Sequence, residues 1–111
     1  HITSDDVMTW DQITRALVAA AGAPADIVHV PSAVIAGADP QWGGSLLGDK
    51  AHSLVFDNSK LRSVVPGYRA VIPFEQGARE IVDWYDADPD RQQVDTRLDA
   101  IMDKLVQDYG G

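Results

Sequence analysis

Three side chains near the middle of the chain have the chemistry to hold a small molecule. Trp42 offers an aromatic face, Lys50 a cation and His52 a neutral hydrogen-bond donor or acceptor. All three lie in residues 31–52, where Pro and Gly interrupt any regular pattern, so we expect a long loop with helical fragments. Ordered long loops are commonly functional. The sequence therefore predicts that Trp42, Lys50 and His52 contact a polar substrate.

Two of these candidates also have a purely structural interpretation. Trp42 would serve as a loop anchor buried on the core, and His52 as a hydrogen-bonded residue at the start of a strand. The sequence leaves the structural and the substrate-binding interpretations open.

Metal and thiol chemistry find no support in the sequence. His1, His29 and His52 share no i,i+4 spacing, and the acidic run over residues 83–90 lacks the Gly and the terminal Glu of a calcium loop. We therefore predict no metal site. Zero cysteines exclude disulfides and thiolate catalysis, and they fit a reducing cytoplasm, where we expect the protein to be located.

A nicotinamide dinucleotide site is not expected in these residues. Such a site needs a strand, a glycine-rich turn and a helix amino terminus, so that the backbone can approach the pyrophosphate closely. Gly43, Gly44 and Gly48 have the wrong spacing and follow no strand of the required kind. The sequence therefore predicts no cofactor-binding residue and no catalytic residue in this chain.

Three helices are expected to position the candidate residues. Thr9 and Gln12 form a capping box before a helix over residues 10–21, which Gly22 ends. A second helix begins at Pro73 and continues to Tyr85. Trp10 and Trp84 lie on the apolar faces of these two helices and are expected in the core. The third helix spans residues 94–109, and a single helical turn is expected over residues 59–64.

Short extended segments are expected between the helices, at residues 1–3, 27–30, 53–56 and 70–72. With the helices, they predict an α/β fold in which three main helices pack on a small sheet of short strands. A chain of 111 residues has the size of one domain. We expect residues 1–87 to form a substrate-binding lobe, and residues 88–111 to form a linker and a carboxyl-terminal amphipathic helix of the same domain.

The charge balance limits the partners. Nine Lys and Arg against seventeen Asp and Glu give a formal net charge of −8, and the basic residues are scattered along the sequence. Such a charge repels nucleic-acid phosphates and anionic lipid headgroups. No apolar run approaches the roughly 18 residues that a membrane span needs. We therefore predict that neither nucleic acid nor membrane is a partner.

One stretch of the sequence resembles the carboxyl-terminal part of extended short-chain dehydrogenase/reductase proteins, the NAD-dependent epimerase/dehydratase family. Its segments are Asp57-Asn58-Ser59-Lys60-Leu61, Val65-Pro66-Gly67-Tyr68, Pro73-Phe74-Glu75-Gln76-Gly77 and Ile81-Val82-Asp83-Trp84-Tyr85. In that family a short helix opens on Asp-x-Ser-Lys, a proline-bearing turn follows, and a longer helix ends near a Trp. The likeness covers most of residues 1–87, and it implies that the chain is the substrate-binding domain of a larger oxidoreductase or isomerase.

The resemblance assigns the chemistry to residues outside this sequence. An amino-terminal Rossmann lobe would bind NAD or NADP and carry the family's Tyr-x-x-x-Lys pair, so we expect this chain alone to be inactive. We also expect His1, which stands where an initiator Met would, to lie inside a longer protein. The implied substrate is a small polar molecule such as a sugar or a nucleotide sugar. However, no Arg lies between Arg15 and Arg62 to grip a diphosphate in a bidentate manner.

A second interpretation is a non-catalytic interaction or dimerisation module. The helix over residues 94–109 lies beyond the family resemblance, and its apolar stripe would pack on a partner subunit as readily as on its own core. The stripe consists of Val94, Leu98, Ile101, Leu105 and Tyr109. In that case a homodimer is expected.

Overall fold

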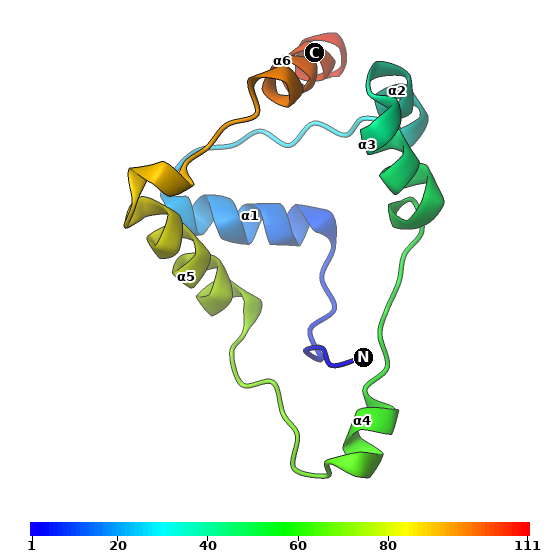
Figure 1. Ribbon diagram of the computed structural model, residues 1–111, viewed down its shortest axis with the longest axis vertical. Helices are drawn as coiled ribbons and strands as arrows, with labels where there is room; N and C mark the ends of the chain where they lie inside the picture. The colour runs from blue at the N-terminus through cyan, green and yellow to red at the C-terminus, as the bar shows by residue number, and fades with distance from the viewer. The chain divides into compact units, whose positions relative to one another are not determined.

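All 111 residues are described by a computed structural model. Helices are the only regular secondary structure of the chain, and irregular segments connect them (Figure 1). It forms two compact units, one of residues 1–25 and 55–92, and the other of residues 26–54 and 93–111. The helices are α1 (Trp10–Ala21), α2 (Ser32–Ala38), α3 (Pro40–Ser45), the π-helix η1 (Leu46–Lys50), α4 (Ser59–Val64), α5 (Phe74–Asp86), the 3₁₀-helix η2 (Pro89–Arg91) and α6 (Thr96–Tyr109).

The predicted sheet is wrong, and with it the α/β fold class. Residues 1–3, 27–30, 53–56 and 70–72 have irregular backbone and no strand is formed anywhere in the chain. The β-branched residues of these segments disfavour helix, but a strand also needs a neighbour to pair with. No two of these segments pair in a ladder, so their preference for extended backbone gives irregular connections between helices and no sheet.

In the first unit, α1 begins as the sequence predicts. The Thr9 backbone N–H donates to Gln12 Oε1 at 2.8 Å, and the Gln12 N–H donates to Thr9 Oγ1 at 3.2 Å, which completes the capping box. Gly22 ends the helix at φ 63°, a left-handed conformation that favours glycine. Both ends of α1 are therefore determined by residues within the helix and its caps.

Helix α5 packs against α1 and buries Ala78 completely. It begins at Phe74, so Pro73 precedes the helix as its cap residue and is not its first helical residue, a difference of one position. Trp10 and Trp84 were expected in the core, but both side chains are more than half exposed. The α1–α5 packing thus leaves both indole rings largely outside the core, while Ala78 is enclosed.

The second unit contains residues 31–52, which were predicted to be a long loop with helical fragments; the helical fragments are confirmed, but they occupy nearly all of residues 32–50 and leave little loop. These residues form α2, α3 and η1, with α2 and α3 packed against each other. Gly43 permits the close approach, because a Cβ there would lie 2.2 Å from the Cα of Ala36. The glycine that was expected to break regular structure is thus the residue that lets two helices touch.

Helix α6 belongs to the same unit and begins at Thr96. The Asp95 carboxylate caps it by accepting from the N–H groups of Arg97 and Leu98, both at 3.0 Å. Within the predicted apolar stripe, Leu105 is buried, while Tyr109 is substantially exposed. Ala78 and Leu105 are the only buried apolar side chains of the chain, so much apolar surface faces outward.

Candidate functional site

The three predicted substrate contacts all belong to the second unit. Trp42 lies in α3 and is partly buried, Lys50 ends the π-helix η1, and His52 occupies an exposed bend two residues later. Lys50 Nζ donates to Ser45 Oγ at 2.9 Å, across the π turn. None of these three side chains lines the apolar hollow along α5 or the one between α2 and α6. Trp42 and Lys50 lie in consecutive helices and His52 lies just after them, but the three side chains do not line one cavity, so their role as substrate contacts stays a prediction.

Trp42 is held in place by the carboxylate of Asp39, which caps α3. The Trp42 backbone N–H donates to Asp39 Oδ1 at 2.7 Å, and Arg97 Nη1 of α6 donates to Asp39 Oδ2 at 2.6 Å. The Asp39 side chain is only 4% exposed, which is tolerable because both oxygens are paired. The Trp42 N–H and then the Arg97 guanidinium lower the pKa of Asp39. This pair joins the start of α3 to the start of α6.

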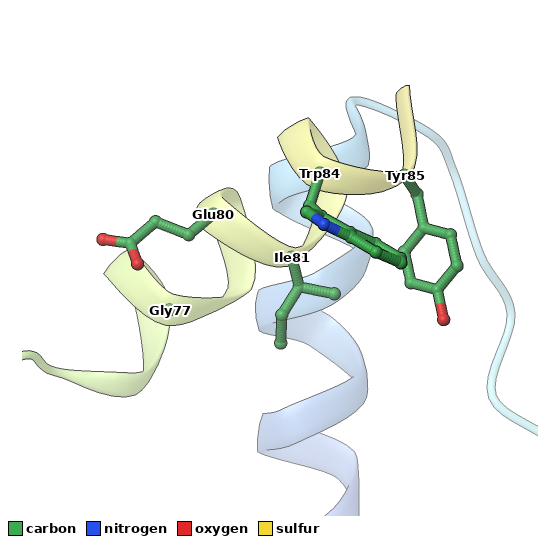
Figure 2. Close-up of a pocket in the computed structure, with 5 residues that line it drawn as sticks. All are labelled: Gly77, Glu80, Ile81, Trp84 and Tyr85. Carbon is green, nitrogen blue, oxygen red and sulfur yellow. The ribbon is translucent and has the colours of Figure 1, made fainter. Parts of the chain in front are cut away.

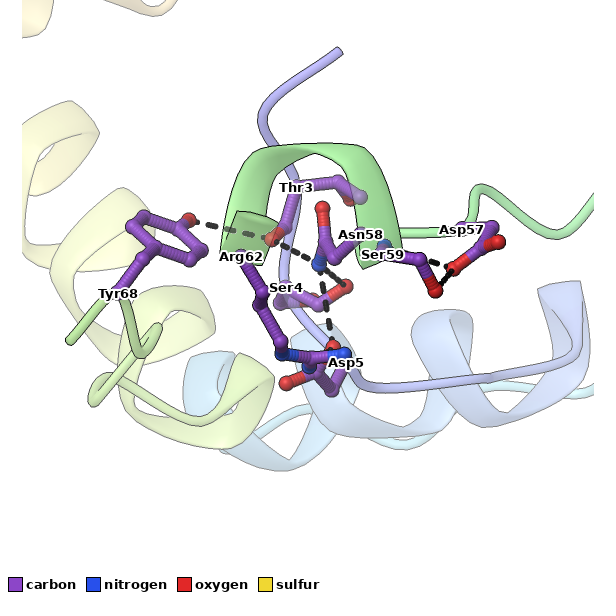
Figure 3. Close-up of polar contacts among 8 residues, drawn as sticks. All are labelled: Thr3, Ser4, Asp5, Asp57, Asn58, Ser59, Arg62 and Tyr68. Carbon is purple, nitrogen blue, oxygen red and sulfur yellow. Dashed lines mark hydrogen bonds and ion pairs between the residues drawn. The ribbon is translucent and has the colours of Figure 1, made fainter. Parts of the chain in front are cut away.

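The Asp57-Asn58-Ser59 segment of the first unit forms the start of α4 (Figure 3). Asp57 Oδ1 accepts from the Ser59 N–H at 2.8 Å and from the Ser59 hydroxyl at 2.6 Å, and these two bonds lower the pKa of Asp57. The Asp57 carboxylate therefore caps the first turn of α4, whose predicted position over residues 59–64 is confirmed. The capping oxygen satisfies a free N–H at the start of the helix.

Asn58 is a cross-link and makes no cap. Its amide Nδ2 donates to the backbone oxygen of Thr3 at 2.9 Å and to Asp5 Oδ1 at 3.1 Å, so it ties α4 to the amino-terminal segment (Figure 3). The Tyr68 hydroxyl donates to the same Thr3 oxygen at 3.1 Å. Asn58 is 2% exposed, and its Oδ1 is buried with no hydrogen-bond partner. Only one half of this amide is therefore satisfied.

The same cluster contains an ion pair between Arg62 of α4 and Asp5. The Asn58 amide, and after it the Arg62 guanidinium, lower the pKa of Asp5 below its ordinary value. The neighbouring cation Lys60 is exposed, and Arg62 makes the contact with Asp5. No local sequence pattern predicts this ion pair, because Asp5 and Arg62 are 57 positions apart.

Two surface hollows are lined mainly by apolar side chains. One, of about 460 Å³, lies in the second unit between α2 and α6, and its lining includes Val34, Ile101 and Leu105. The other, of about 660 Å³, lies along α5 in the first unit (Figure 2). It is lined by Gly77, Glu80, Ile81, Trp84 and Tyr85. Sequence reasoning missed both hollows as candidate sites.

The carboxyl end of α5 is closed by side chains that follow it. Arg91 Nη1 donates to the Trp84 backbone oxygen at 2.6 Å, and Gln92 Nε2 donates to the Tyr85 oxygen at 3.2 Å. The Arg91 guanidinium also lies 4.3 Å from the centre of the Trp84 ring, a cation–π geometry. Arg91 and Gln92 thus satisfy two helix-end carbonyls and hold Trp84 at the rim of the hollow.

No three His, Asp or Glu side chains lie close enough together to hold a metal ion. None of the helices combines the length and the apolar character that a membrane crossing requires. Comparisons with protein-family models, with curated proteins and with solved structures found no match to this chain.

Proposed function

We propose that this chain is the carboxyl-terminal substrate-binding part of an NAD(P)-dependent oxidoreductase or isomerase similar to the epimerase/dehydratase family. The observation that carries the proposal is the Asp57-Asn58-Ser59-Lys60 segment. A short helix opens on it, a proline-bearing turn follows, and α5 then ends near Trp84, in the order that the resemblance implies.

The distribution of apolar surface supports a role as part of a larger protein. Large apolar side chains are exposed in the irregular segments, among them Val55, Phe56, Val71 and Ile72. Contiguous exposed apolar surface in proteins commonly marks an interaction site. A neighbouring lobe of the same polypeptide would cover such surface.

In this proposal the two lobes divide the work. The amino-terminal Rossmann lobe binds NAD or NADP and supplies the Tyr and Lys that transfer protons, while this chain contacts a small polar substrate, such as a sugar, through Trp42, Lys50 and His52. The π-helix η1 supports the choice of segment, because π turns occur frequently at functional sites. A cytoplasmic location belongs to the same proposal.

Two measurements test the division of labour. Calorimetry of this chain with NAD and with NADP should give no specific binding, and micromolar affinity would overturn the proposal. The coding sequence upstream of His1 should contain G-x-x-G-x-x-G after a strand and Tyr-x-x-x-Lys further on. An upstream sequence without these motifs would equally refute it.

The substrate contacts are tested in the intact parent protein with two exposed lysines. Lys50→Ala should raise KM for the substrate several-fold with little change in kcat, because Lys50 is assigned to binding alone. Lys60→Ala is the matched control, since Lys60 is also exposed but lies outside the candidate segment. Equal KM values for the two variants would remove Lys50 from the site.

The alternative function is a protein-interaction or dimerisation module built on α6. It is favoured by one observation: Met102, Val106 and Tyr109 remain exposed on α6 although Leu105 is buried. Sedimentation of the chain over a range of concentrations would detect a dimer, and Val106→Asp should abolish it. Gln107→Asp, at an exposed neighbouring position, is the control. A chain that stays monomeric at all concentrations excludes the homodimer.

A further inference from the structure

The second unit is assembled from two segments that are far apart in the sequence. One is residues 26–54, which form α2, α3 and η1, and the other is residues 93–111, which contain α6. Irregular backbone over residues 92–95 connects α6 to the first unit. Residues 26–54, which we name the receiving segment, are fewer than the roughly 40 that a chain needs to fold alone without a metal or a disulfide. The docking of α6 therefore completes the second unit.

Contacts near the start, the middle and the end of α6 hold it on the receiving segment. Near the start, Arg97 Nη1 donates to Asp39 Oδ2 at 2.6 Å. Further along, Leu105 is 7% exposed and lines the hollow between α2 and α6. Just after the helix, Gly110 lies close to Val28, because a Cβ on Gly110 would be 3.1 Å from Val28 Cγ2. The structure thus shows both the docking surface and the helix that occupies it.

The apolar packing under α6 is incomplete. A hollow of about 460 Å³ stays open between α2 and α6, with Val34, Ile101 and Leu105 among its lining residues. Leu105 is the only buried residue of α6. Elements with few buried apolar contacts open at lower cost than the rest of a protein. Release of α6 therefore exposes little apolar surface, and the hinge at residues 92–95 has no helical hydrogen bonds to break.

The polar contacts determine which helix fits the vacated surface. The Asp39 side chain is 4% exposed and the Arg97 side chain 63%, so the carboxylate depends on its partner more than the guanidinium does. Lys104 and Asp108, which also line the hollow, pair with each other at 3.2 Å within α6 and stay paired when the helix leaves. The receiving segment therefore needs an apolar helix with a cation near its start, as α6 has.

We propose that the receiving segment binds the α6 of a second copy of this chain in place of its own, so that two chains exchange their carboxyl-terminal helices. Exchange of an identical element is a low-cost route to a dimer, because the same contacts form between chains as within one. Arg97 of each chain then pairs with Asp39 of the other, and Leu105 of each enters the other's hollow. The inference does not rest on the proposed function. It also differs from the interaction module above, which uses the exposed face of α6 that contains Val106.

Charge complementation tests the exchange. Arg97→Asp and Asp39→Arg each place like charges together, so neither variant should dock α6 on itself or in its own homodimer. In an exchanged dimer of the two variants, opposite charges meet at both docking sites. Sedimentation should therefore find each variant monomeric and their mixture dimeric. The double variant Asp39→Arg/Arg97→Asp is the control, because it restores the pair within one chain. A monomeric mixture, with the double variant folded, would overturn the inference.

Chemical cross-linking gives a second measurement that leaves the cap of α3 intact. The chain has no cysteine, so Val34→Cys in one copy and Ile101→Cys in another supply a single thiol on each side of the hollow. A short bismaleimide should join the two copies, and mass spectrometry should find several-fold more mixed product than with the control Asp103→Cys, an exposed position of the same helix. Equal or absent mixed product would contradict the exchange. A dimer that Val106→Asp dissolves and Arg97→Asp leaves intact would contradict it as well.

Discussion

The contact between Gly43 and Ala36 predicts opposite effects for two neighbouring glycine substitutions. Both Gly43 and Gly44 lie in α3, and replacing either by Ala improves helix propensity by about 0.5–1 kcal/mol. At Gly44 a new Cβ would meet nothing within 4 Å, so this gain is the whole effect. At Gly43 the Cβ would lie 2.2 Å from the Ala36 Cα, and both atoms belong to the framework of packed helices.

The size of the effect follows from these distances. Ordinary van der Waals contact is 3.4–4 Å, so α2 and α3 would have to separate by more than 1 Å. Overpacking of this kind costs roughly 1–3 kcal/mol. Subtracting the propensity gain leaves Gly43→Ala less stable than the original chain by about 1 kcal/mol. The two alanine variants should therefore differ by about 2 kcal/mol.

The assay is urea unfolding of both variants, followed by far-ultraviolet circular dichroism and by hydrogen exchange of the α2 and α3 amides. The exchange measurement assigns the change to the second unit, since the two units need not unfold together. Gly44→Ala is the matched control, because it has the same chemistry one residue away. Equal stability of the two variants would refute the reasoning, because it would mean that α2 and α3 do not touch at Gly43.

Three further predictions concern the caps and the polar contacts. Asn58→Ala should destabilise the first unit by roughly 1–3 kcal/mol and speed amide exchange in residues 3–5, because the part-buried Thr3 oxygen and the Asp5 carboxylate each lose one donor. Unchanged exchange would contradict the cross-link, and Ser63→Ala on the same helix is the control. Asp39 has a pKa below its ordinary value of 3.8, so its contribution to stability is present above that pH and is lost as the pH falls through the lowered value. In Asp39→Asn the free energy of unfolding should therefore fall less steeply at acid pH. The same acid pH dependence in both proteins would disprove the pairing with Arg97. Thr9→Ala should cost about 1 kcal/mol while Thr9→Ser costs little, as measured by thermal unfolding, because only the hydroxyl cap distinguishes them.

The sequence predicted the helices that are specified by short-range signals. The capping box at Thr9 and Gln12, the left-handed stop at Gly22 and the apolar periodicity of α5 and α6 all involve residues within a few positions of one another. The end of α6 before Gly110 followed from the same kind of pattern. Local signals of this kind do not depend on what the helix packs against.

The sequence failed where the outcome depended on a distant neighbour. The β-branched residues at 27–30 and the apolar residues at 53–56 favour extended backbone, but a strand requires a paired partner, and none lies beside them. Residues 31–52 were expected to be mostly loop because of their glycines, with only fragments of helix, yet Gly43 is accommodated within α3 by its contact with Ala36. Both errors have one cause: whether a residue's backbone preference gives a strand, a helix or a loop depends on the segment that packs beside it.

The sequence by itself determined the approximate positions of α1, α5 and α6, the net charge of −8 and the lack of cysteine thiols, while the roles of Trp42, Lys50 and His52 stay predictions. Only the tertiary structure decided which residues are joined across the chain: Asn58 and Arg62 with the segment before α1, and Asp39 with Arg97. Helix caps and periodicity act within one or two turns, whereas a buried hydrogen bond between residues more than fifty positions apart exists only once the chain has folded.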